Sequence, residues 1–539
     1  MQALTQLAAA LADWRAALGA EHVRDDAATL AAYQNNVGGL QRHIPAVLRP
    51  ASTAEVQTVV HLANRHRVPL YPISRGRNWG LGSRLPGRDG VVVVDLARLN
   101  RIREVNVAGQ YAVVEPGVTQ GQLFDHLEQQ QLPLLLNVTG ASRDTSLLGN
   151  ALERGIGYFS TRAHSLSGLE IVLGSGELLR TGFSHIAHVK TAHGYRHGIG
   201  PELDGLFAQS NYGIVTSAGF ELMPKPEAAM AVIAKIKDAA QLAAFVEALA
   251  DLRRRDVVRS VWHIGNRERT QIALGPLVFG QLRQREPDAT FVALRAKAEA
   301  LIAAAGFGPW SAVCGILGSA GELKLARRAI RSALHGLAQV MFITDGLLRA
   351  ADTLSRPFDF VPWVRDQRIM LHSVRPLADL ARGIPTDGPM QSVWWPLGEL
   401  PEKPSDDPDQ SHCGMLFCVP FLPPDGRCAR EAMDLTYQVY AKHGFTPFVT
   451  LNLVDSRSLE CVINNAFDRR QPERVAAAHA CNDELTTEFI RRGYPPYRVG
   501  PQDTRLIVDE HDLFWRTVRD LKHVFDPNGI IAPGRYNLV

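Results

Sequence analysis

The chain has 539 residues, of which 46% are hydrophobic and 21% are charged. These shares are typical of a globular protein, and the length exceeds one ordinary core, so we expect two or more folding units. The formal net charge of +3 excludes a broad basic surface for nucleic acid, and no apolar run is long enough to cross a membrane.

The six cysteines are scattered and form no CxxC or CxxCH pair, which excludes the usual zinc and covalent haem sites. Scattered cysteines in a large chain indicate reduced thiols. The N-terminus has no basic region and no obvious signal cleavage pattern. We therefore expect a cytoplasmic protein without a metal.

The first 130 residues alternate between helix and strand signals. Leucines and a tryptophan at helical spacing predict a helix over residues 2–20, and a short strand follows at 45–50. Ser52-Thr-Ala-Glu55 predicts a capping box at the start of a helix to about residue 65. A strand over 110–117 precedes a helix that begins after Thr119. This alternation predicts an α+β unit with mixed sheets.

A glycine-rich loop over residues 74–83 joins two apolar runs, 68–73 and 91–95. Its glycines at 76, 80 and 82 allow positive φ angles that turn N–H groups inward, and such a nest binds an anion, here a pyrophosphate. The arginines at 75, 77 and 84 add positive potential. Taken alone, the loop favours the alternative of an ordinary glycine-rich turn between strands, because such stretches are common.

Residues 145–157 form a second glycine-rich stretch, in which Gly149, Gly155 and Gly157 allow close approach to a flat ring. Glu153 within it is either a functional acid or a surface partner of Arg154. The histidines over residues 183–200 match no zinc spacing, so we interpret this segment as a polar surface loop.

The character of the chain changes near residue 224. Residues 227–350 are rich in Ala, Leu and Arg, with helices predicted at about 239–254, 291–305 and 322–336, and strands at 229–234 and 312–317. Residues 399–411 form a polar, proline-rich loop. We expect a second domain in which helices cover a sheet.

Six segments, in one order along almost the whole chain, resemble the vanillyl-alcohol oxidase and para-cresol methylhydroxylase flavoprotein family. They begin with Pro72-Ile-Ser-Arg-Gly-Arg-Asn-Trp-Gly-Leu-Gly82 and Gly149-Asn-Ala-Leu-Glu-Arg-Gly-Ile-Gly-Tyr158. The others are residues 169–182, 204–216, Tyr497-Arg498 and Phe525-Asp-Pro-Asn-Gly-Ile-Ile-Ala-Pro-Gly-Arg535. The branch that oxidises para-substituted phenols resembles the chain most.

The resemblance implies an α+β fold, with an FAD-binding domain of two α/β subdomains and a cap domain whose sheet is covered by helices. It divides the chain into residues 1–223 for FAD binding, 224–489 for the cap, and 490–539 returning to the FAD domain. The cofactor-binding residues it implies are Ser74, Arg75, Gly76, Arg77, Asn78, Trp79, Gly80, Ser83, Thr145, Gly149, Asn150, Gly155, Gly157, Tyr158, Gly213, Ile214, Val215 and Arg535.

The catalytic residues that the resemblance implies are Glu153, Tyr497, Arg498 and Glu460. Tyr497 and Arg498 match the pair that binds a phenolate, and Arg498 also stabilises charge on the reduced flavin. An acid at Glu153 lies beside the flavin in the family. Glu460 stands where relatives carry a histidine pair; a carboxylate there disfavours a phenolate but can act as a base or bind a hydroxyl or amine.

Two departures bear on the cofactor and the substrate. Phenol-oxidising relatives carry Gly-Tyr-Gly in the loop, whereas this chain has Gly80-Leu81-Gly82 and lacks that hydroxyl. The family's histidine anchors for flavin correspond to Asn78 and Met415, and neither side chain can form the bond, so we expect non-covalent FAD. His412 is close to the second anchor, and a bulge in the strand would bring it into place.

We therefore expect an FAD-dependent oxidase or dehydrogenase that transfers a hydride from a para-substituted phenol or related aromatic alcohol to flavin N5. The alternatives are oxidation of a non-phenolic alcohol, an amine or a specialised-metabolite intermediate, and a flavin-binding accessory protein without turnover. The electron acceptor is oxygen or another molecule. The resemblance also implies a homodimer or a larger assembly.

Overall fold

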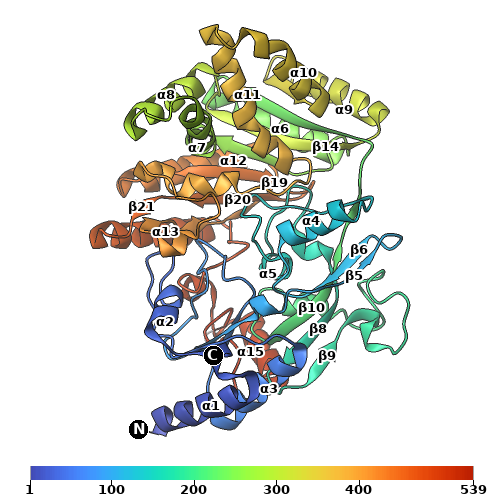
Figure 1. The fold of residues 1–539 in the computed structure, drawn as a ribbon, viewed down its shortest axis with the longest axis vertical. Helices are drawn as coiled ribbons and strands as arrows, with labels where there is room; N and C mark the ends of the chain where they lie inside the picture. The colour runs from blue at the N-terminus through green and yellow to red at the C-terminus, as the bar shows by residue number, and fades with distance from the viewer. Residues whose placement is uncertain (1, 538–539) are drawn as a thin grey trace.

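The computed structural model describes residues 2–537. Its lower part in Figure 1 contains the N-terminal residues and the C-terminal segment, and the chain between them forms the upper part. Helices and sheets are mixed in both parts, which confirms the predicted α+β class. We call the upper part the cap.

The N-terminal sheet has four strands in the order β1-β2-β4-β3, in which β2, β4 and β3 run parallel. Helices α1 and α3 pack together beside it, and Trp14 is fully buried there, as the helical spacing predicts. The bounds are α1 Gln2–Leu18, β1 Val23–Arg24, α2 Ala27–Tyr33, β2 Val47–Leu48, α3 Thr53–His66, β3 Leu70–Ile73 and β4 Val92–Asp95.

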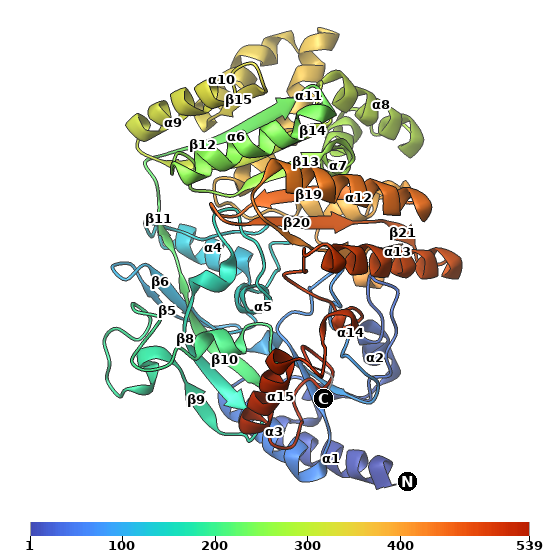
Figure 2. The same cartoon turned by 180° about the vertical axis from the view of Figure 1, so that it is seen from behind.

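A second sheet of five antiparallel strands has the order β5-β6-β10-β8-β9. The chain returns to it at its end, where α15 lies beside β10 in both Figure 1 and Figure 2. The bounds are β5 Ile102–Asn106, β6 Tyr111–Val114, α4 Gln120–Gln129, β7 Leu134–Leu135, α5 Leu147–Leu152, β8 Leu166–Leu173, β9 Leu178–Arg180, β10 Gly213–Glu221, β11 Met223–Pro224, α14 Thr504–Ile507 and α15 Leu513–Phe525.

The cap contains an eight-stranded antiparallel sheet in the order β15-β12-β14-β13-β19-β20-β17, with β18 also paired to β20. The strands are β12 Ala228–Ile236, β13 Trp262–Asn266, β14 Trp310–Gly318, β15 Gln339–Ile343, β16 Cys413–Gly414, β17 Phe417–Cys418, β18 Phe421–Leu422, β19 Phe448–Leu453, β20 Leu459–Asn464 and β21 Phe467–Asp468. The helices are α6 Leu242–Arg254, α7 Arg267–Arg285, α8 Phe291–Ala304, α9 Ala320–Ala333, α10 Asp345–Ser355, α11 Pro362–Leu380, α12 Gly426–Lys442 and α13 Pro472–Arg491.

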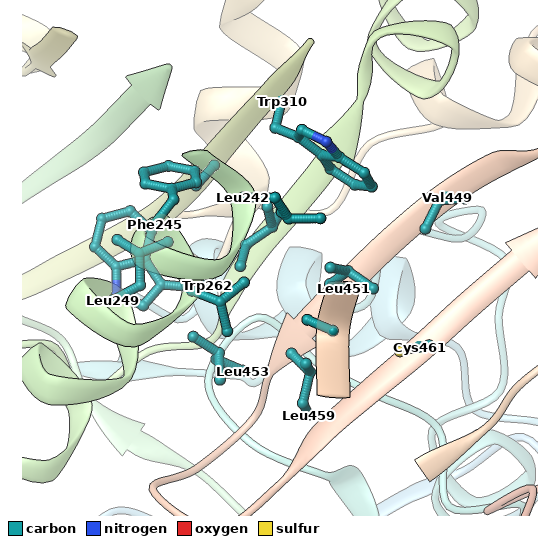
Figure 3. Packing of buried hydrophobic residues seen from close by; sticks show 14 of the residues in the cluster. Leu242, Phe245, Leu249, Trp262, Trp310, Val449, Leu451, Leu453, Leu459 and Cys461 are labelled. Carbon is teal, nitrogen blue, oxygen red and sulfur yellow. The ribbon is translucent and has the colours of Figure 1, made fainter. Parts of the chain in front are cut away.

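The two faces of the cap sheet have different surroundings. Figure 3 shows the first face, where Trp262, Leu451 and Cys461 pack with residues of α6 in an apolar core. Because side chains alternate along a strand, their neighbours at positions 263, 452 and 460 point to the opposite face. That face carries the candidate site.

Most predicted elements are present, with two corrections. Ser52 accepts a hydrogen bond from the Glu55 N–H at 3.2 Å, but the Glu55 carboxylate accepts from Ala51 N–H instead of closing the box on Ser52. The cap contains long helices that sequence periodicity did not predict, above all α7 and α11. The segment over 183–200 is a largely exposed loop, as expected.

Among residues 2–537, no helix is long and apolar enough to span a membrane. All six cysteines have free thiols, and five of them are buried. Within the same described residues, no three metal-ligating side chains come together.

Candidate active site

Two adjacent cavities form the candidate site: the larger lies between the cap sheet and the FAD-binding part, and the smaller lies within the FAD-binding part. The larger, of about 380 Å³, is lined by one face of the cap sheet, by α7 and α11, and by the loop around residue 79. The smaller, of about 170 Å³, is lined by the loop after β3, by α5 and by the start of β10. Arg77, Asn78 and Asn150 line both, so one long ligand can occupy the two cavities together.

The smaller cavity has the shape and the donors that a pyrophosphate requires. Gly76 has a φ of 65°, a backbone conformation that favours glycine. A Cβ on Gly149 would lie 2.9 Å from the Ser74 Oγ and would fill the cradle. The Thr145 Oγ1 is buried without a hydrogen-bond partner in the described chain. A phosphate oxygen would satisfy this hydroxyl, so these residues fit FAD.

The arginines of the glycine-rich loop are already paired, which corrects the expectation of free positive potential. Arg75 and Arg77 both contact the Asp144 carboxylate, at 2.9 and 2.8 Å. Arg84 binds Asp407, and its guanidinium also lies 3.4 Å from Asp409. The backbone cradle, rather than net charge, is therefore the main feature for binding phosphate.

The proline-rich loop of the cap closes over the glycine-rich loop, a contact that the sequence did not predict. The Trp79 indole donates to Asp407 at 2.8 Å, and the Ser83 hydroxyl donates to Asp409 at 2.9 Å. Burial and the charge of Asp407 raise the pKa of the Asp409 carboxyl to about 6, against the opposing effect of Arg84. This contact joins the cap to the cofactor loop.

Most predicted cofactor residues line one of the cavities. Trp79 and Tyr158 line the larger. Those lining the smaller are Ser74, Arg75, Gly76, Arg77, Asn78, Ser83, Thr145, Gly149, Asn150, Gly213, Ile214 and Val215.

Three predicted glycines line neither cavity. They make room for protein side chains: a Cβ would lie 2.3 Å from Asn150 Oδ1 at Gly155 and 2.1 Å from Asn137 Oδ1 at Gly157. At Gly80, a Cβ would lie 2.4 Å from the Phe417 ring. Gly155 and Gly157, expected to approach a flat ring, and Gly80 of the anion-binding loop thus border protein side chains in this structure.

Glu153 and Arg535 bind each other, a contact that the sequence did not predict. The Arg535 guanidinium donates to Glu153 at 3.0 Å, and the Tyr536 hydroxyl donates to the same carboxylate oxygen. Glu153 lines the smaller cavity and not the larger, and Arg535 lines neither. The pair fastens the C-terminal segment to α5; Glu153 is not a partner of Arg154.

A row of polar side chains crosses the cavity face of the cap sheet. His263 of β13 stands opposite Asn452 of β19, which stands opposite Glu460 of β20. The Asn452 Nδ2 donates to the Glu460 carbonyl at 3.0 Å, so its Oδ1 must accept from the His263 Nδ1–H, at 2.7 Å. Burial lowers the pKa of His263 to about 4. The ring is therefore neutral, and its unpartnered Nε2 is an acceptor.

Glu460 ends this row beside Tyr497 and Arg498. Its carboxyl is 7% exposed, accepts a hydrogen bond of 3.4 Å from Thr161, and has no partner at Oε2 in the described chain. Burial raises the pKa of Glu460 to about 7, while Thr161 and Arg498 oppose the shift. Val462 and Asn464, on the same face of β20, line the larger cavity, so the carboxyl lies at its edge.

The predicted pair Tyr497-Arg498 lies at this edge. Arg498 lines the larger cavity and donates to Asn78 Oδ1 at 2.7 Å. Burial raises the pKa of the Tyr497 hydroxyl above its usual range, and Glu460 adds to the shift, so Tyr497 remains a proton donor. The structure thus brings together three of the four predicted catalytic residues and leaves out Glu153.

Sequence reasoning missed Arg269 and His263, which also line the larger cavity. Arg269 is in the first turn of α7, and its guanidinium has neither an ion pair nor a side-chain hydrogen bond among residues 2–537. Burial lowers the pKa of Arg269. The sequence around each residue contains no motif that would identify it. Both residues reach the cavity only because strands far apart in the sequence pair in the cap.

Comparison with known proteins agrees with this geometry. Residues 44–182 match the family model described as FAD binding domain. The chain is 34% identical to 1'-carboxy-chondrochloren decarboxylase of Chondromyces crocatus, covering 98% of this chain and 97% of that protein. It is 28% identical to the 4-cresol dehydrogenase flavoprotein subunit of Pseudomonas putida, over 98% of this chain and 94% of the relative.

Among solved structures, the chain resembles p-cresol methylhydroxylase with substrate bound, with a TM-score of 0.82 and 26% identity, covering 99% of this chain and 97% of the other. These matches support an FAD-dependent enzyme rather than an accessory protein without turnover. The chain belongs to the family of FAD-dependent oxidoreductases that includes para-cresol methylhydroxylase.

Proposed function

We propose that this enzyme oxidises a para-substituted phenol or a related aromatic alcohol at the carbon attached to the ring. Bound FAD supplies the hydride acceptor. The 4-cresol dehydrogenase subunit and the p-cresol methylhydroxylase structure support this substrate class. The observation that carries the proposal is the buried Glu460 carboxyl, unpartnered at Oε2, beside Tyr497 and Arg498.

Tyr497, Arg498 and Glu460 have different roles at the substrate oxygen. Tyr497 donates a hydrogen bond and Arg498 supplies positive charge, and both favour the phenolate over the phenol, whose ordinary pKa is about 10. Glu460 takes the phenol proton, which its raised pKa makes easier than for an ordinary carboxyl. Once protonated, Glu460 is neutral and no longer repels the phenolate. The carboxylate is therefore compatible with a phenol.

A non-phenolic substrate is the alternative, and Leu81 supports it. Leu81 lines the larger cavity where phenol-oxidising relatives carry a tyrosine, so one hydroxyl donor for a phenolate is missing. An aromatic alcohol or an amine would donate its own proton to Glu460. The phenol remains our first proposal because the other pair, Tyr497 and Arg498, is present.

Loss of a carboxylate after oxidation is a second candidate function. The relative from Chondromyces crocatus is named a decarboxylase, and the unpaired Arg269 on the cavity wall favours a substrate with a carboxylate. After a hydride has left the carbon, departing CO₂ leaves its bonding pair with the substrate. No further oxidant is needed, so both reactions begin with the same reduction of FAD.

A panel of substrates tests the proposal. Anaerobic enzyme would be mixed with 4-alkylphenols, the matching benzylic alcohols without a phenolic hydroxyl, and benzylic amines, while flavin absorbance is followed. We expect the phenols to bleach the flavin. Bleaching by the alcohols or amines alone would establish the alternative instead.

Reoxidation of the flavin and assembly are further proposals. We propose that oxygen or a second redox protein reoxidises the flavin, since a relative is named the flavoprotein subunit of a larger enzyme. Admitting air to the bleached enzyme separates the two: rapid return of the yellow colour indicates an oxidase. We also propose a cytoplasmic homodimer or larger assembly, which light scattering and cell fractionation test.

A further inference from the structure

The larger cavity is lined by positively charged side chains and, within residues 2–537, by no negatively charged ones. Arg77, Arg269 and Arg498 line it, and no Asp or Glu is among its lining residues. Arg77 is paired with Asp144 at 2.8 Å, and Arg498 lies beside the buried Glu460. Arg269 has no carboxylate within ion-pair distance in the described chain. A buried unpaired cation is costly, so a ligand that supplies the missing anion gains affinity from it.

The groups around Arg269 are hydrogen-bond donors. Tyr158 and Ser311 both line the cavity, and the Ser311 hydroxyl is buried without a hydrogen-bond partner in the part of the chain that the structure describes. Arg269 and Tyr158 are close enough that each shifts the other's pKa. Ser311 stands opposite Gly265 in the sheet, and a Cβ on Gly265 would lie 3.6 Å from the Arg269 Cγ. These three donors therefore surround one space.

No acidic side chain of the described residues lines this cavity to neutralise the charge of Arg269. The His263 ring lies against Tyr158 with ring centroids 4.2 Å apart and tilted planes, and it is neutral. Its Nδ1 proton is already used by Asn452 at 2.7 Å. An anion would receive its hydrogen bonds from Arg269, Tyr158 and Ser311, and a planar carboxylate matches the fork of a guanidinium.

We propose that the substrate carries a carboxylate and that Arg269, Tyr158 and Ser311 bind it. This rests on the proposed function, because it assigns the other end of the same substrate. His263 and Glu460 lie two strands apart in one row, which separates their backbones by about 10 Å. An aromatic ring with its oxygen near Glu460 thus reaches Arg269 through a para side chain of two or three carbons that ends in the carboxylate.

Two matched ligands test the proposal: 3-(4-hydroxyphenyl)propanoate and its primary amide, which have the same shape and differ in charge. Dissociation constants would be measured anaerobically on the FAD-loaded enzyme, from the concentration dependence of the bleaching rate where a ligand reduces the flavin and from the shift of the flavin spectrum where it does not. We expect the acid to bind about tenfold to a hundredfold more tightly than the amide, the range for hydrogen bonds to a charged group. Arg269→Gln should abolish this preference while changing amide affinity little.

Three further variants make the test specific. Tyr158→Phe should reduce the preference for the acid only in part. Arg269→Lys keeps the positive charge but not the planar guanidinium, so it should give an intermediate preference. The same variant replaces Arg269→Gln in the test if Arg269→Gln does not fold. Arg267→Gln, at an exposed position of the same helix, should leave the preference unchanged.

Equal binding of acid and amide to the parent, or a preference that survives in Arg269→Gln, would overturn the carboxylate site. Absence of any spectral change with both ligands would overturn it too. A different result would show that the proposed function is wrong while the carboxylate site is right. In that case the acid binds more tightly than the amide, but neither the acid nor any other phenol reduces the flavin.

Discussion

At the scale of single residues, the candidate site contains buried polar groups that lack their usual hydrogen-bond partners. Glu460, Arg269 and His263 each have a buried polar atom that nothing in the described chain satisfies, and all three lie on one side of the cap sheet. Buried polar atoms are usually hydrogen-bonded, so such a cluster indicates a place for a ligand. Glu460 could be predicted from sequence because it lies seven residues before the Phe467 strand that the family shares. Arg269 could not, since only the long-range pairing of β13 with β14 and β19 brings it to the cavity.

Glu460→Gln should remove the base. Because the pKa of Glu460 is raised to about 7, its carboxyl is protonated below that pH and can accept a proton only above it. The rate constant of flavin reduction in the parent should therefore rise as the pH increases through about 7. In Glu460→Gln it should be lower by about 10²–10⁴-fold, the range for a general base, and should lose this rise.

The matched control is Glu473→Gln, at an exposed position in the first turn of α13. It should behave as the parent does. A Glu460→Gln enzyme with the parent's rate and pH profile would show that this carboxyl takes no proton from the substrate.

Arg498→Ala should slow flavin reduction more than it weakens flavin retention. The guanidinium faces the cavity and is fixed by Asn78 at 2.7 Å, so its charge acts where negative charge develops. Removing one such stabilising group costs about a hundredfold or more in rate. Stopped-flow reduction and FAD content after gel filtration measure the two effects; Arg498→Lys should lie between. Equal reduction rates in Arg498→Ala and the parent would refute the role.

At the scale of elements, the cap shows where sequence patterns succeed and fail. α6, α8 and α9 have apolar positions at helical spacing and were predicted close to their observed bounds. α7 was not, because it contains Gly275 and Pro276 and is packed on several sides; a Cβ on Gly275 would lie 2.4 Å from Trp395. Tertiary packing, rather than local propensity, holds this helix in place.

The residues in and next to strand β16 lead us to expect that FAD is bound without a covalent bond. Met415 and Asn78 line the larger cavity at the positions of the family's histidine anchors. His412 lines neither cavity and pairs with Glu399 at 3.0 Å. Acid precipitation should leave the yellow colour in the supernatant. Colour in the pellet, with FAD mapped by mass spectrometry to a peptide, would contradict this reading of the strand.

At the scale of the whole molecule, six ordered motifs were sufficient to predict the family and the α+β class. The contact of the two parts was not predictable. Trp79 and Asp407 are 328 positions apart in the sequence, yet they share a hydrogen bond that closes the cap over the cofactor loop. Such a contact leaves no periodic signal in either segment. A site between two parts of the chain suits a reaction that must be shielded from water.

The reaction proposed for the larger cavity is hydride removal from the carbon attached to an aromatic ring. Anaerobic stopped-flow reduction by a 4-alkylphenol, with hydrogen or deuterium at that carbon, tests it most directly. The account predicts that the substrate bleaches the flavin and that deuterium slows the bleaching, because breaking the carbon–hydrogen bond is part of that step. A flavin that no phenol, aromatic alcohol or amine of the panel reduces would contradict the account.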